Sequence, residues 1–291
     1  MADSRLLRRF DRIIVAGRGR LGTSLHGALK AKGLASELVP GRDVAVMGRR
    51  VVVDGAALLV LAVPDPAITS TAAELVSALP SQGVSVIHLS GLLGVAALAP
   101  LADVGIDVGA FHPFQSFPRP RPPAAFAGST FGIDASSERL FAELDALARL
   151  LGGVSRRVRD SERALYHVAG VMASNYLTCL AHEACLALQA AGWGRDEALQ
   201  AVIPLMAGAV ENLAAAGLPG ALIGPIRRGD SDGVALHLAA IDAAGPVANR
   251  LKSVYQLLGL VAVELATEAG LEPSRAQAMT TFLTTNQEVL R

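Results

Sequence analysis

Cysteine is scarce in this chain, which has 291 residues and only Cys179 and Cys185. Two cysteines on one predicted helix indicate neither a disulfide framework nor a metal site. We therefore expect two buried free thiols and no metal ion.

A net charge of either sign is also missing, because 26 basic residues balance 26 acidic ones. Proteins that bind nucleic acid or an anionic membrane surface usually carry a basic excess. The composition therefore favours a small-molecule substrate as the partner, with no nucleic acid and no membrane.

Uninterrupted apolar runs of membrane-spanning length are not expected, although apolar residues make up 52% of the chain. Pro, Gly, His or charged residues interrupt each long apolar stretch before it could cross a bilayer. The opening stretch MADSRLLRRFDR has no apolar segment of the kind that a secretory signal requires. We expect a cytoplasmic protein with a large core.

Short apolar runs alternate with helical patterns through residue 159, as in repeated β-α units. The predicted strands span residues 12–16, 36–39, 58–63, 84–89, 107–111, 130–134 and 154–158. From residue 160 onward, Ala- and Leu-rich helical patterns take over, with a kink expected at Pro204. The sequence thus predicts an α/β fold: a Rossmann doubly wound, mostly parallel sheet at 1–159, and an all-α domain at 160–291.

The stretch IIVAGRGRLGTSLHGAL, residues 13–29, has the pattern of a dinucleotide-binding turn. Gly17, Gly19 and Gly22 have the G-x-G-x-x-G spacing between an apolar strand and a helical pattern. Such a turn brings a pyrophosphate close to backbone N–H groups at a helix N-terminus. The predicted cofactor-binding residues are Gly17, Arg18, Gly19, Arg20, Leu21, Gly22, Arg42, Val63 and Pro64.

The end of the second predicted strand bears on the choice between NADP and NAD. NAD sites usually place Asp or Glu there to bind the ribose hydroxyls. Here residues 39–41 offer no carboxylate, and Arg42 supplies a guanidinium that suits a phosphate dianion, with Arg49 and Arg50 downstream. We expect NADP rather than NAD. The alternatives are Arg42 as a solvated loop residue and Asp43 as a ribose ligand.

Polar residues follow two later strands, in the sequences IHLSG and GAFHPFQSF. Ser90 and Gly91 follow the strand that contains His88, where backbone N–H groups could hold a ligand oxygen. His112 lies at the end of the next strand, where Pro113 fixes the backbone. We expect Ser90 and His112 to be catalytic and Gly91 to bind substrate. The alternative for His112 is an ordinary surface histidine.

A narrow polar stripe marks the long helix predicted over residues 160–192. At 100° per residue, its members are Arg163, His167, Ser174, Asn175, Thr178 and His182. Such a stripe lines a wet cleft, or else forms a buried polar network or a subunit contact. We expect His167 and Asn175 to be catalytic and Ser174 to bind substrate.

Loops and caps supply three further predictions. The Pro-rich stretch SFPRPRPPAAFAGS, residues 116–129, is expected to be a mobile loop or lid beside the site. Asp160 or Ser161 is expected to cap the long helix. In GPIRRGD, Arg228 is expected to clamp a substrate carboxylate, unless the loop serves only to let Asp230 cap the next helix.

Taken together, these motifs resemble Rossmann-like proteins whose helical C-terminal domain is a domain of unknown function. That group is related to pyrroline-5-carboxylate reductase, prephenate dehydrogenase, and the 6-phosphogluconate and hydroxyacid dehydrogenases. The resemblance covers almost the whole chain and is carried by GxGxxG at Gly17, LAVPD at Leu61, HLSG at His88, FHPFQSF at Phe111, YHVAGVMASNY at Tyr166 and GPIRRGD at Gly224. It implies a nicotinamide-binding domain, a helical domain like that of 6-phosphogluconate dehydrogenase that usually forms a homodimer, and a site between them.

The chain departs from the hydroxyacid dehydrogenases in its lysines, which are only Lys30, Lys32 and Lys252. Those relatives place a catalytic Lys on the long helix between the domains, and none of the three lies there. Two routes stay open. His112 or His167 acts as acid or base, or the substrate is an imine, which demands less proton handling.

The sequence therefore predicts an NADP(H)-dependent oxidoreductase. It would transfer hydride to or from a small carbonyl or imine substrate, expected to carry a carboxylate, in the cleft between the domains. The alternative is a non-catalytic NADP(H)-binding sensor or regulatory protein. Both functions require nucleotide binding, and they differ in turnover.

Overall fold

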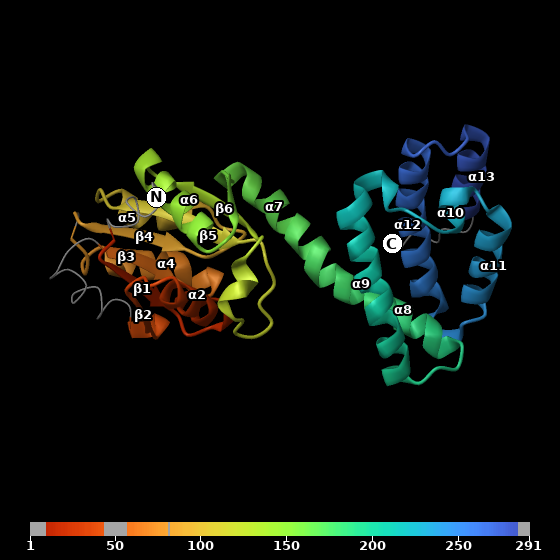
Figure 1. Ribbon diagram of the computed structural model, residues 1–291, viewed down its shortest axis with the longest axis horizontal. Helices are drawn as coiled ribbons and strands as arrows, with labels where there is room; N and C mark the ends of the chain where they lie inside the picture. Colours follow the sequence, from red (N-terminus) through yellow and green to blue (C-terminus); the bar gives the residue numbers. More distant parts are fainter. Residues whose placement is uncertain (1–9, 44–56, 81, 285–291) are drawn as a thin grey trace. The chain divides into compact units, whose positions relative to one another are not determined.

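The computed structural model of the chain describes residues 10–43, 57–80 and 82–284. The chain divides into two compact units, Met1–Ser174 and Asn175–Arg291, which we call the sheet unit and the helical unit (Figure 1). This division lies beyond the boundary predicted after residue 159. The reason is that Arg163 and Tyr166 hydrogen-bond to the sheet unit and hold their helix against it.

Seven strands form one sheet in the order β2-β1-β3-β4-β5-β6-β7. They are β1 (Arg12–Ala16), β2 (Ser36–Val39), β3 (Ala57–Leu61), β4 (Val84–His88), β5 (Asp107–Pro113), β6 (Thr130–Ala135) and β7 (Val154–Arg157). Neighbouring strands are parallel except β5 and β6, which are antiparallel. The predicted mostly parallel, doubly wound sheet is confirmed, with strand bounds close to those expected.

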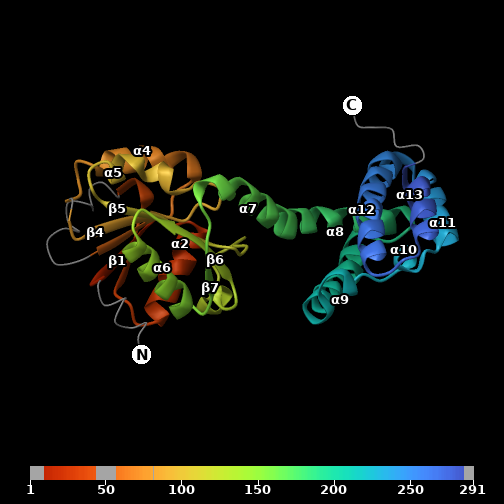
Figure 2. The same ribbon diagram turned by 90° about the horizontal axis from the view of Figure 1, so that it is seen from above.

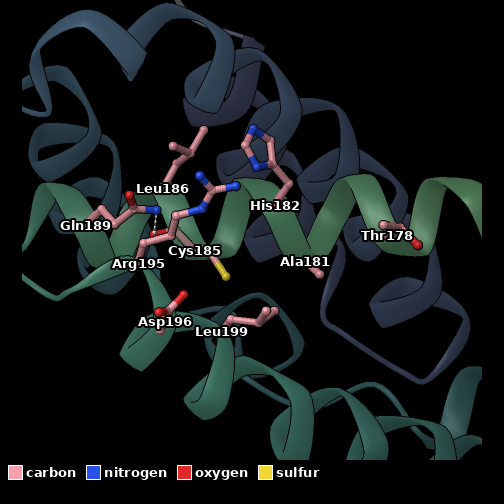
Figure 3. Close-up of a pocket in the computed structure, with 9 residues that line it drawn as sticks. All are labelled: Thr178, Ala181, His182, Cys185, Leu186, Gln189, Arg195, Asp196 and Leu199. Carbon is pink, nitrogen blue, oxygen red and sulfur yellow. Dashed lines mark hydrogen bonds between the residues drawn. The ribbon is translucent and has the colours of Figure 1, made fainter.

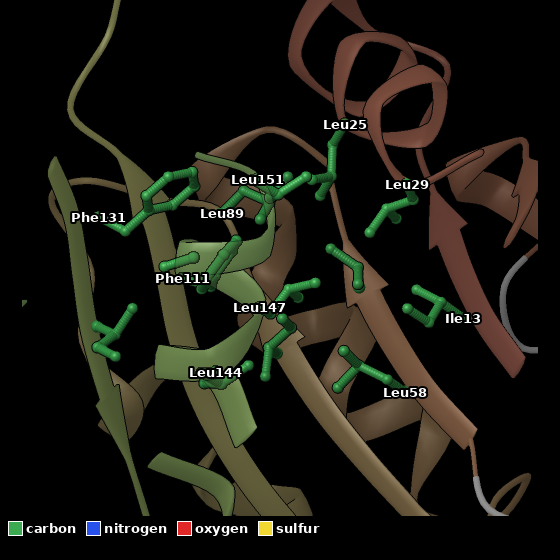
Figure 4. Close-up of a cluster of buried hydrophobic side chains, with 14 of the residues drawn as sticks. Ile13, Leu25, Leu29, Leu58, Leu89, Phe111, Phe131, Leu144, Leu147 and Leu151 are labelled. Atoms are coloured by element: carbon green, nitrogen blue, oxygen red, sulfur yellow. The ribbon is translucent and has the colours of Figure 1, made fainter. Parts of the chain in front are cut away.

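Helices cover both faces of this sheet, as Figures 1 and 2 show. They are α2 (Arg20–Ala31), α4 (Asp65–Leu75), α5 (Ala99–Ala102) and α6 (Glu138–Leu150). Successive side chains of a strand point to opposite faces, so Ile13 and Val15 pack with α2 and α6 (Figure 4), while Ile14 and Ala16 pack with α4 and α5. Each such fully buried side chain contributes roughly 1.5–3 kcal/mol relative to an exposed one. The sheet unit thus has two buried cores of its own.

The order in which successive strands are added to the sheet reverses at β1. Strand β2 pairs with one edge of β1, and β3 pairs with the other. In an open α/β sheet, ligands bind beyond the carboxyl ends of the strands at such a switch point. The glycine turn follows β1 and therefore lies at this position.

The helical unit contains helices only, within the part of the chain that the structure describes. They are α8 (Tyr176–Ala190), α9 (Arg195–Gly220), α10 (Pro225–Arg228), α11 (Ser231–Asp242), α12 (Ala248–Glu268) and α13 (Pro273–Thr284). Pro204 lies inside α9, where the kink is predicted, and keeps helical angles, while the helix is broken at Gly217 (φ 62°) and Leu218. Glycine tolerates the left-handed conformation without a Cβ penalty, which explains why the break falls there.

The long helix predicted over residues 160–192 is interrupted once. It consists of α7 (Arg163–Gly170), a π-helical turn at Val171–Asn175, and α8, after which Gly192 (φ 94°) ends the run. A π turn has more residues per turn than an α-helix, so the uniform 100° step behind the predicted polar stripe does not hold through it. The stripe is therefore not continuous.

One segment of the helical unit is apolar enough, and long enough, to cross a membrane. It spans Arg195–Arg228, with a mean hydropathy of 1.5 in its most apolar window and only 6% of that window buried. This contradicts the expectation that every apolar stretch is too short. One such helix is weak evidence for a membrane span, because the core helix of a globular protein passes the same test by length and composition. The segment leaves a large apolar surface on a single copy of the chain.

Candidate functional site

The three glycines of the turn have three different surroundings. A Cβ on Gly17 (φ 133°) would lie 2.1 Å from the Ala62 carbonyl oxygen, and a Cβ on Gly22 would lie 2.1 Å from the Gly17 carbonyl oxygen. A Cβ on Gly19 would meet no atom within 4 Å. The outer glycines are thus required by close packing of the turn against β3 and α2, and the middle one faces open space. This is the division of roles that a dinucleotide turn requires.

A cleft of about 590 Å³ opens in front of this turn. Its lining residues are Gly17, Arg18, Gly19, Arg20, Leu21, Gly22, Gly41, Ala62, Val63, Pro64, Asp65, Leu89, Ser90, Gln115 and Phe117. The N-cap of α2 is Gly19, which offers no side chain to the first amides of the helix. Those amides and the helix dipole suit an anion such as a pyrophosphate. All the predicted cofactor-binding residues except Arg42 line the cleft.

Arg42 lies just outside the lining residues, next to Gly41. Its side chain is 88% exposed and forms an ion pair with Asp43, with 3.7 Å between Nε and Oδ1. An exposed guanidinium with one weak ion pair is free to bind a phosphate. Arg49 and Arg50 lie outside the described residues.

The Pro-rich segment 116–129 lies beside the cleft, as predicted, since Phe117 lines it, and the segment contains ordered contacts. The Arg121 N–H donates to Ser24 Oγ (2.8 Å), and Arg20 Nη1 donates to the Pro118 carbonyl oxygen (3.3 Å). Residues Pro123–Phe126 form a 3-10 turn, and Phe126 is fully buried among Phe117 and Phe131. These two hydrogen bonds anchor the segment on α2. They join residues that are distant in sequence, which is why the sequence pattern did not predict them.

The loop after β4 is held by two carboxylates. Ser90 Oγ donates to Asp65 Oδ2 (2.7 Å) and accepts the N–H groups of Leu92 and Leu93. Asp160 accepts the N–H groups of Val95 and Ala96, although the sequence predicted it as the cap of the long helix. The Ser90 hydroxyl therefore orients the loop beside the cleft, with its hydrogen already donated.

His88 lies inside the sheet unit and is fully hydrogen-bonded. Its Nε2 lies 2.9 Å from the Gly94 carbonyl oxygen, and its Nδ1 accepts the Ser90 N–H. Burial lowers its pKa. A neutral imidazole with both nitrogens bonded is a structural residue.

Arg163 is fully buried at the start of α7, where the predicted stripe would have put it in a wet cleft. Nη1 donates to the Ser90 carbonyl oxygen (3.3 Å), while Nε and Nη2 have no hydrogen-bond partner. Burial lowers the pKa of this guanidinium, although nearby Asp134 and Asp160 oppose that shift. The sheet unit thus keeps a positive charge directly behind Ser90.

His112 and Tyr166 form a side-chain pair that the sequence did not predict. His112 Nδ1 lies 2.9 Å from Tyr166 Oη, and the rings meet edge to face, with centroids 5.6 Å apart. Burial, followed by the charge of Arg163, lowers the pKa of His112 to about 4. Burial raises the pKa of Tyr166 to about 12. Both groups are therefore neutral near pH 7, and the only signal for Tyr166 was its place in the motif YHVAGVMASNY.

Two family models match the chain, one in each half. Residues 26–113 match the Rossmann-like domain, and residues 129–262 match the domain of unknown function DUF2520. The chain thus combines a segment that matches the Rossmann-like model with one that matches the DUF2520 model. A comparison with curated proteins found no match.

Several solved structures share the fold of this chain. A protein assigned as an NADP oxidoreductase from Bacteroides fragilis is 22% identical, with a TM-score of 0.65 over 88% of this chain and 99% of its own. A Thermotoga maritima protein is 19% identical, with a TM-score of 0.64 over 89% and 98%. Plasmodium falciparum pyrroline carboxylate reductase, solved with NADP bound, is 11% identical, with a TM-score of 0.56 over 83% and 98%.

Of the remaining predicted site residues, some lie in the sheet unit and others in the helical unit. His167 is exposed on α7, Gly91 lies against the His112 ring, and Ser174 is in the π turn. Asn175 and Arg228 belong to the helical unit, so the structure does not group them with the cleft. Their predicted roles stay predictions.

Arg228 is one of three arginines that line a pocket of the helical unit. This pocket, of about 600 Å³, is lined by Arg227, Arg228, Gly270, Leu271, Glu272 and Arg275. The neighbouring Asp230 accepts the Gly233 N–H (2.9 Å) at the start of α11. The alternative that Asp230 caps the next helix is confirmed.

A second pocket of the helical unit, of about 370 Å³, collects polar residues of α8 and α9 (Figure 3). It is lined by Thr178, Ala181, His182, Cys185, Leu186, Gln189, Arg195, Asp196 and Leu199. Cys185 is buried, but Cys179 is exposed, so the expectation of two buried thiols is wrong for Cys179. Among residues 10–43, 57–80 and 82–284, no three His, Cys, Asp or Glu side chains group as metal ligands would.

Proposed function

We propose that this protein is an NADP(H)-dependent oxidoreductase that transfers hydride to or from a small carbonyl or imine substrate, expected to carry a carboxylate. The observation that carries the proposal is the glycine turn, in which Gly17 and Gly22 are closed by packing and Gly19 faces an open cleft. A ligand that approaches the backbone would account for a glycine at the middle position, because protein packing does not require one there.

The groups around the cleft fit a phosphorylated dinucleotide. The first amides of α2 would bind the pyrophosphate, and Arg42 would bind the 2′-phosphate that distinguishes NADP from NAD. Two structural relatives support this choice. The Plasmodium falciparum reductase carries NADP, and a reductive aminase from Aspergillus terreus, 14% identical with a TM-score of 0.51 over 94% of this chain and 92% of its own, carries NADPH.

The reaction end of the cleft is assigned to Ser90 and its neighbours. When bound, the nicotinamide would supply or accept the hydride. Asp65 orients the Ser90 hydroxyl, and Gly91 leaves room for the His112 ring beside it. His112 stays neutral near pH 7, so its contribution is a hydrogen bond rather than an ionised acid.

We also propose that the helical unit forms a homodimer. Its large exposed apolar side chains include Leu205 (76% exposed), Ile223 (75%) and Leu236 (71%). The α9 segment buries only 6% of its most apolar window within one copy. Exposed apolar surface of this extent usually marks an interface, and a second copy of the chain offers a surface that is equally apolar.

Two measurements test the proposed function. Calorimetry with NADPH and NADH should give binding of both, tighter for NADPH. A panel of 2-oxoacids, cyclic imines and hydroxyacids, followed by nucleotide absorbance, should give turnover that His167→Ala reduces. Tight binding without turnover across the panel would favour the sensor. The absence of binding of either nucleotide at millimolar concentration would overturn both functions.

A further inference from the structure

Among the described residues that line the nucleotide cleft, Asp65 is the only acidic one. It is the first residue of α4 and follows β3. Arg18 and Arg20 line the same cleft, and the first amides of α2 suit a polyanion. A carboxylate in such a cleft repels the phosphates of a dinucleotide, so its presence there favours a contact with an uncharged part of the same ligand.

The hydrogen bond between Ser90 and Asp65 runs from the hydroxyl to the carboxylate. Ser90 Oγ accepts the N–H groups of Leu92 (3.2 Å) and Leu93 (3.0 Å). An N–H group can only donate, so both lone pairs of the Ser90 oxygen are used, and its hydrogen goes to Asp65 Oδ2, 2.7 Å away. Asp65 Oδ1 accepts no hydrogen bond from any residue that the structure describes. One carboxylate oxygen is therefore left for a donor on a ligand.

The strands beside the cleft follow the order of the parts of NADP. The sheet order runs β2-β1-β3-β4-β5, where Arg42 follows β2, the glycine turn follows β1, Asp65 follows β3 and Ser90 follows β4. In the proposed function, Arg42 binds the 2′-phosphate and the glycine turn binds the pyrophosphate. The next part of the ligand is the ribose of the nicotinamide half, and the next strand is β3, which ends beside Asp65.

We propose that Asp65 binds the hydroxyl groups of the nicotinamide ribose. This inference rests on the proposed function and adds a cofactor-binding residue to it. The nicotinamide ribose carries the only vicinal diol of NADP, because the adenosine ribose is phosphorylated at its 2′ position. An ionised carboxylate accepts charge-assisted hydrogen bonds from such hydroxyls, as the acidic residue of an NAD site does at the adenosine ribose. Ser90 holds one oxygen of Asp65, and the ribose occupies the other.

Two other roles of Asp65 make a different prediction. An acidic residue in the first turn of a helix is stabilised by the helix dipole, and Asp65 has this position in α4. Asp65 also anchors the loop after β4 through Ser90. Neither role involves a hydroxyl group of the ligand. Both therefore predict that the ribose hydroxyls contribute equally to binding with and without the Asp65 carboxylate.

Calorimetry with the full chain and NADPH tests the contact without any activity measurement. Asp65→Asn keeps an acceptor for the Ser90 hydroxyl and places an NH₂ group where the ribose hydroxyls would donate. We expect NADPH to bind about tenfold more weakly to this variant. A carboxylate that only repels the phosphates would give the opposite sign, because loss of its charge would tighten binding. Equal or tighter binding by Asp65→Asn would overturn the inference.

Two ligands separate the ribose from the phosphates. Adenosine 2′,5′-bisphosphate lacks the nicotinamide ribose, so Asp65→Asn should bind it at least as tightly as the wild type does. An NADPH analogue without the two hydroxyls of the nicotinamide ribose should bind the wild type about tenfold more weakly than NADPH. Asp65→Asn should bind NADPH and this analogue almost equally. Additive losses from the variant and the analogue would contradict the contact.

Glu74→Gln is the matched control on the same helix. It removes one negative charge from α4 at an exposed position that does not line the cleft. We expect wild-type affinity for NADPH, and a loss equal to that of Asp65→Asn would overturn the inference. A wild type that binds neither NADPH nor the bisphosphate at millimolar concentration would overturn the proposed function. Binding of both ligands with no effect of Asp65→Asn would overturn only the role of Asp65.

Discussion

The sheet unit and the helical unit differ in how completely each buries its own apolar residues. In the sheet unit, the clusters on the two faces of the sheet contain fully buried side chains such as Leu58, Leu59 and Phe111. In the helical unit the buried clusters are small, and leucines such as Leu205 lie on the surface. A doubly wound sheet covers both of its faces with its own helices, whereas the helices of the helical unit leave large apolar side chains exposed on a single copy. The difference suggests that the sheet unit binds the ligand and the helical unit associates.

The largest effect is expected from a charge placed on the apolar surface of the helical unit. Leu205→Asp should raise the dissociation constant of the dimer at least about hundredfold, because burial of an unpaired carboxylate costs several kcal/mol. Sedimentation velocity over a range of concentrations measures this change. Val104→Asp, at a position 42% exposed on the sheet unit, is the control and should stay dimeric. A wild-type chain that is monomeric at every concentration would contradict the proposal that the helical unit forms a homodimer.

The next effect concerns the open position of the glycine turn. Gly19→Ala should weaken nucleotide binding by about tenfold or more with little change in stability, because its methyl group meets no protein atom and occupies the space proposed for the phosphates. Gly27→Ala on α2 is the matched control, since its methyl group also meets no atom within 4 Å. Calorimetry and thermal unfolding separate the two variants. Equal affinities would mean that the ligand does not approach the turn.

A smaller effect is expected at the end of β2. Arg42→Ala should lower the affinity for NADPH by about tenfold, since a charge-assisted hydrogen bond to a phosphate contributes about 1.5–3 kcal/mol. The affinity for NADH should stay the same, which makes NADH the internal control. Equal losses for the two nucleotides would place Arg42 elsewhere on the ligand. Dimerisation should be unaffected.

The smallest effect is a pH dependence of stability in the sheet unit. The pKa of His112 falls from about 6.5 in the unfolded chain to about 4 in the folded protein, and burial also lowers the pKa of His88. Between pH 6.5 and 4 the unfolded chain therefore binds more protons, so stability falls as the pH falls through this window. We expect His112 to contribute on the order of 1 kcal/mol, a melting shift of a few degrees between pH 7 and 5. A His112→Gln protein with an undiminished shift would exclude His112 as its source.

Short-range sequence patterns predicted the structural features that depend on residues close together in the chain. The strands are predicted because short apolar runs bounded by turns are short-range signals. The glycine turn is predicted because its spacing follows from a strand, a tight turn and a helix in succession. The break at Gly217 was not predicted. Propensity ranks Pro as the stronger breaker, yet α9 keeps helical angles at Pro204.

The sequence alone determined the layered α/β architecture, the helical second half and the position of the nucleotide turn, since each follows from periodicity within one or two elements. Tertiary structure decided the rest. It paired His112 with Tyr166 across 54 positions, buried Arg163 behind Ser90, and anchored the Pro-rich segment on α2 through Ser24. Contacts of this kind depend on which strand ends and helix faces meet in space, and no short-range pattern encodes that meeting.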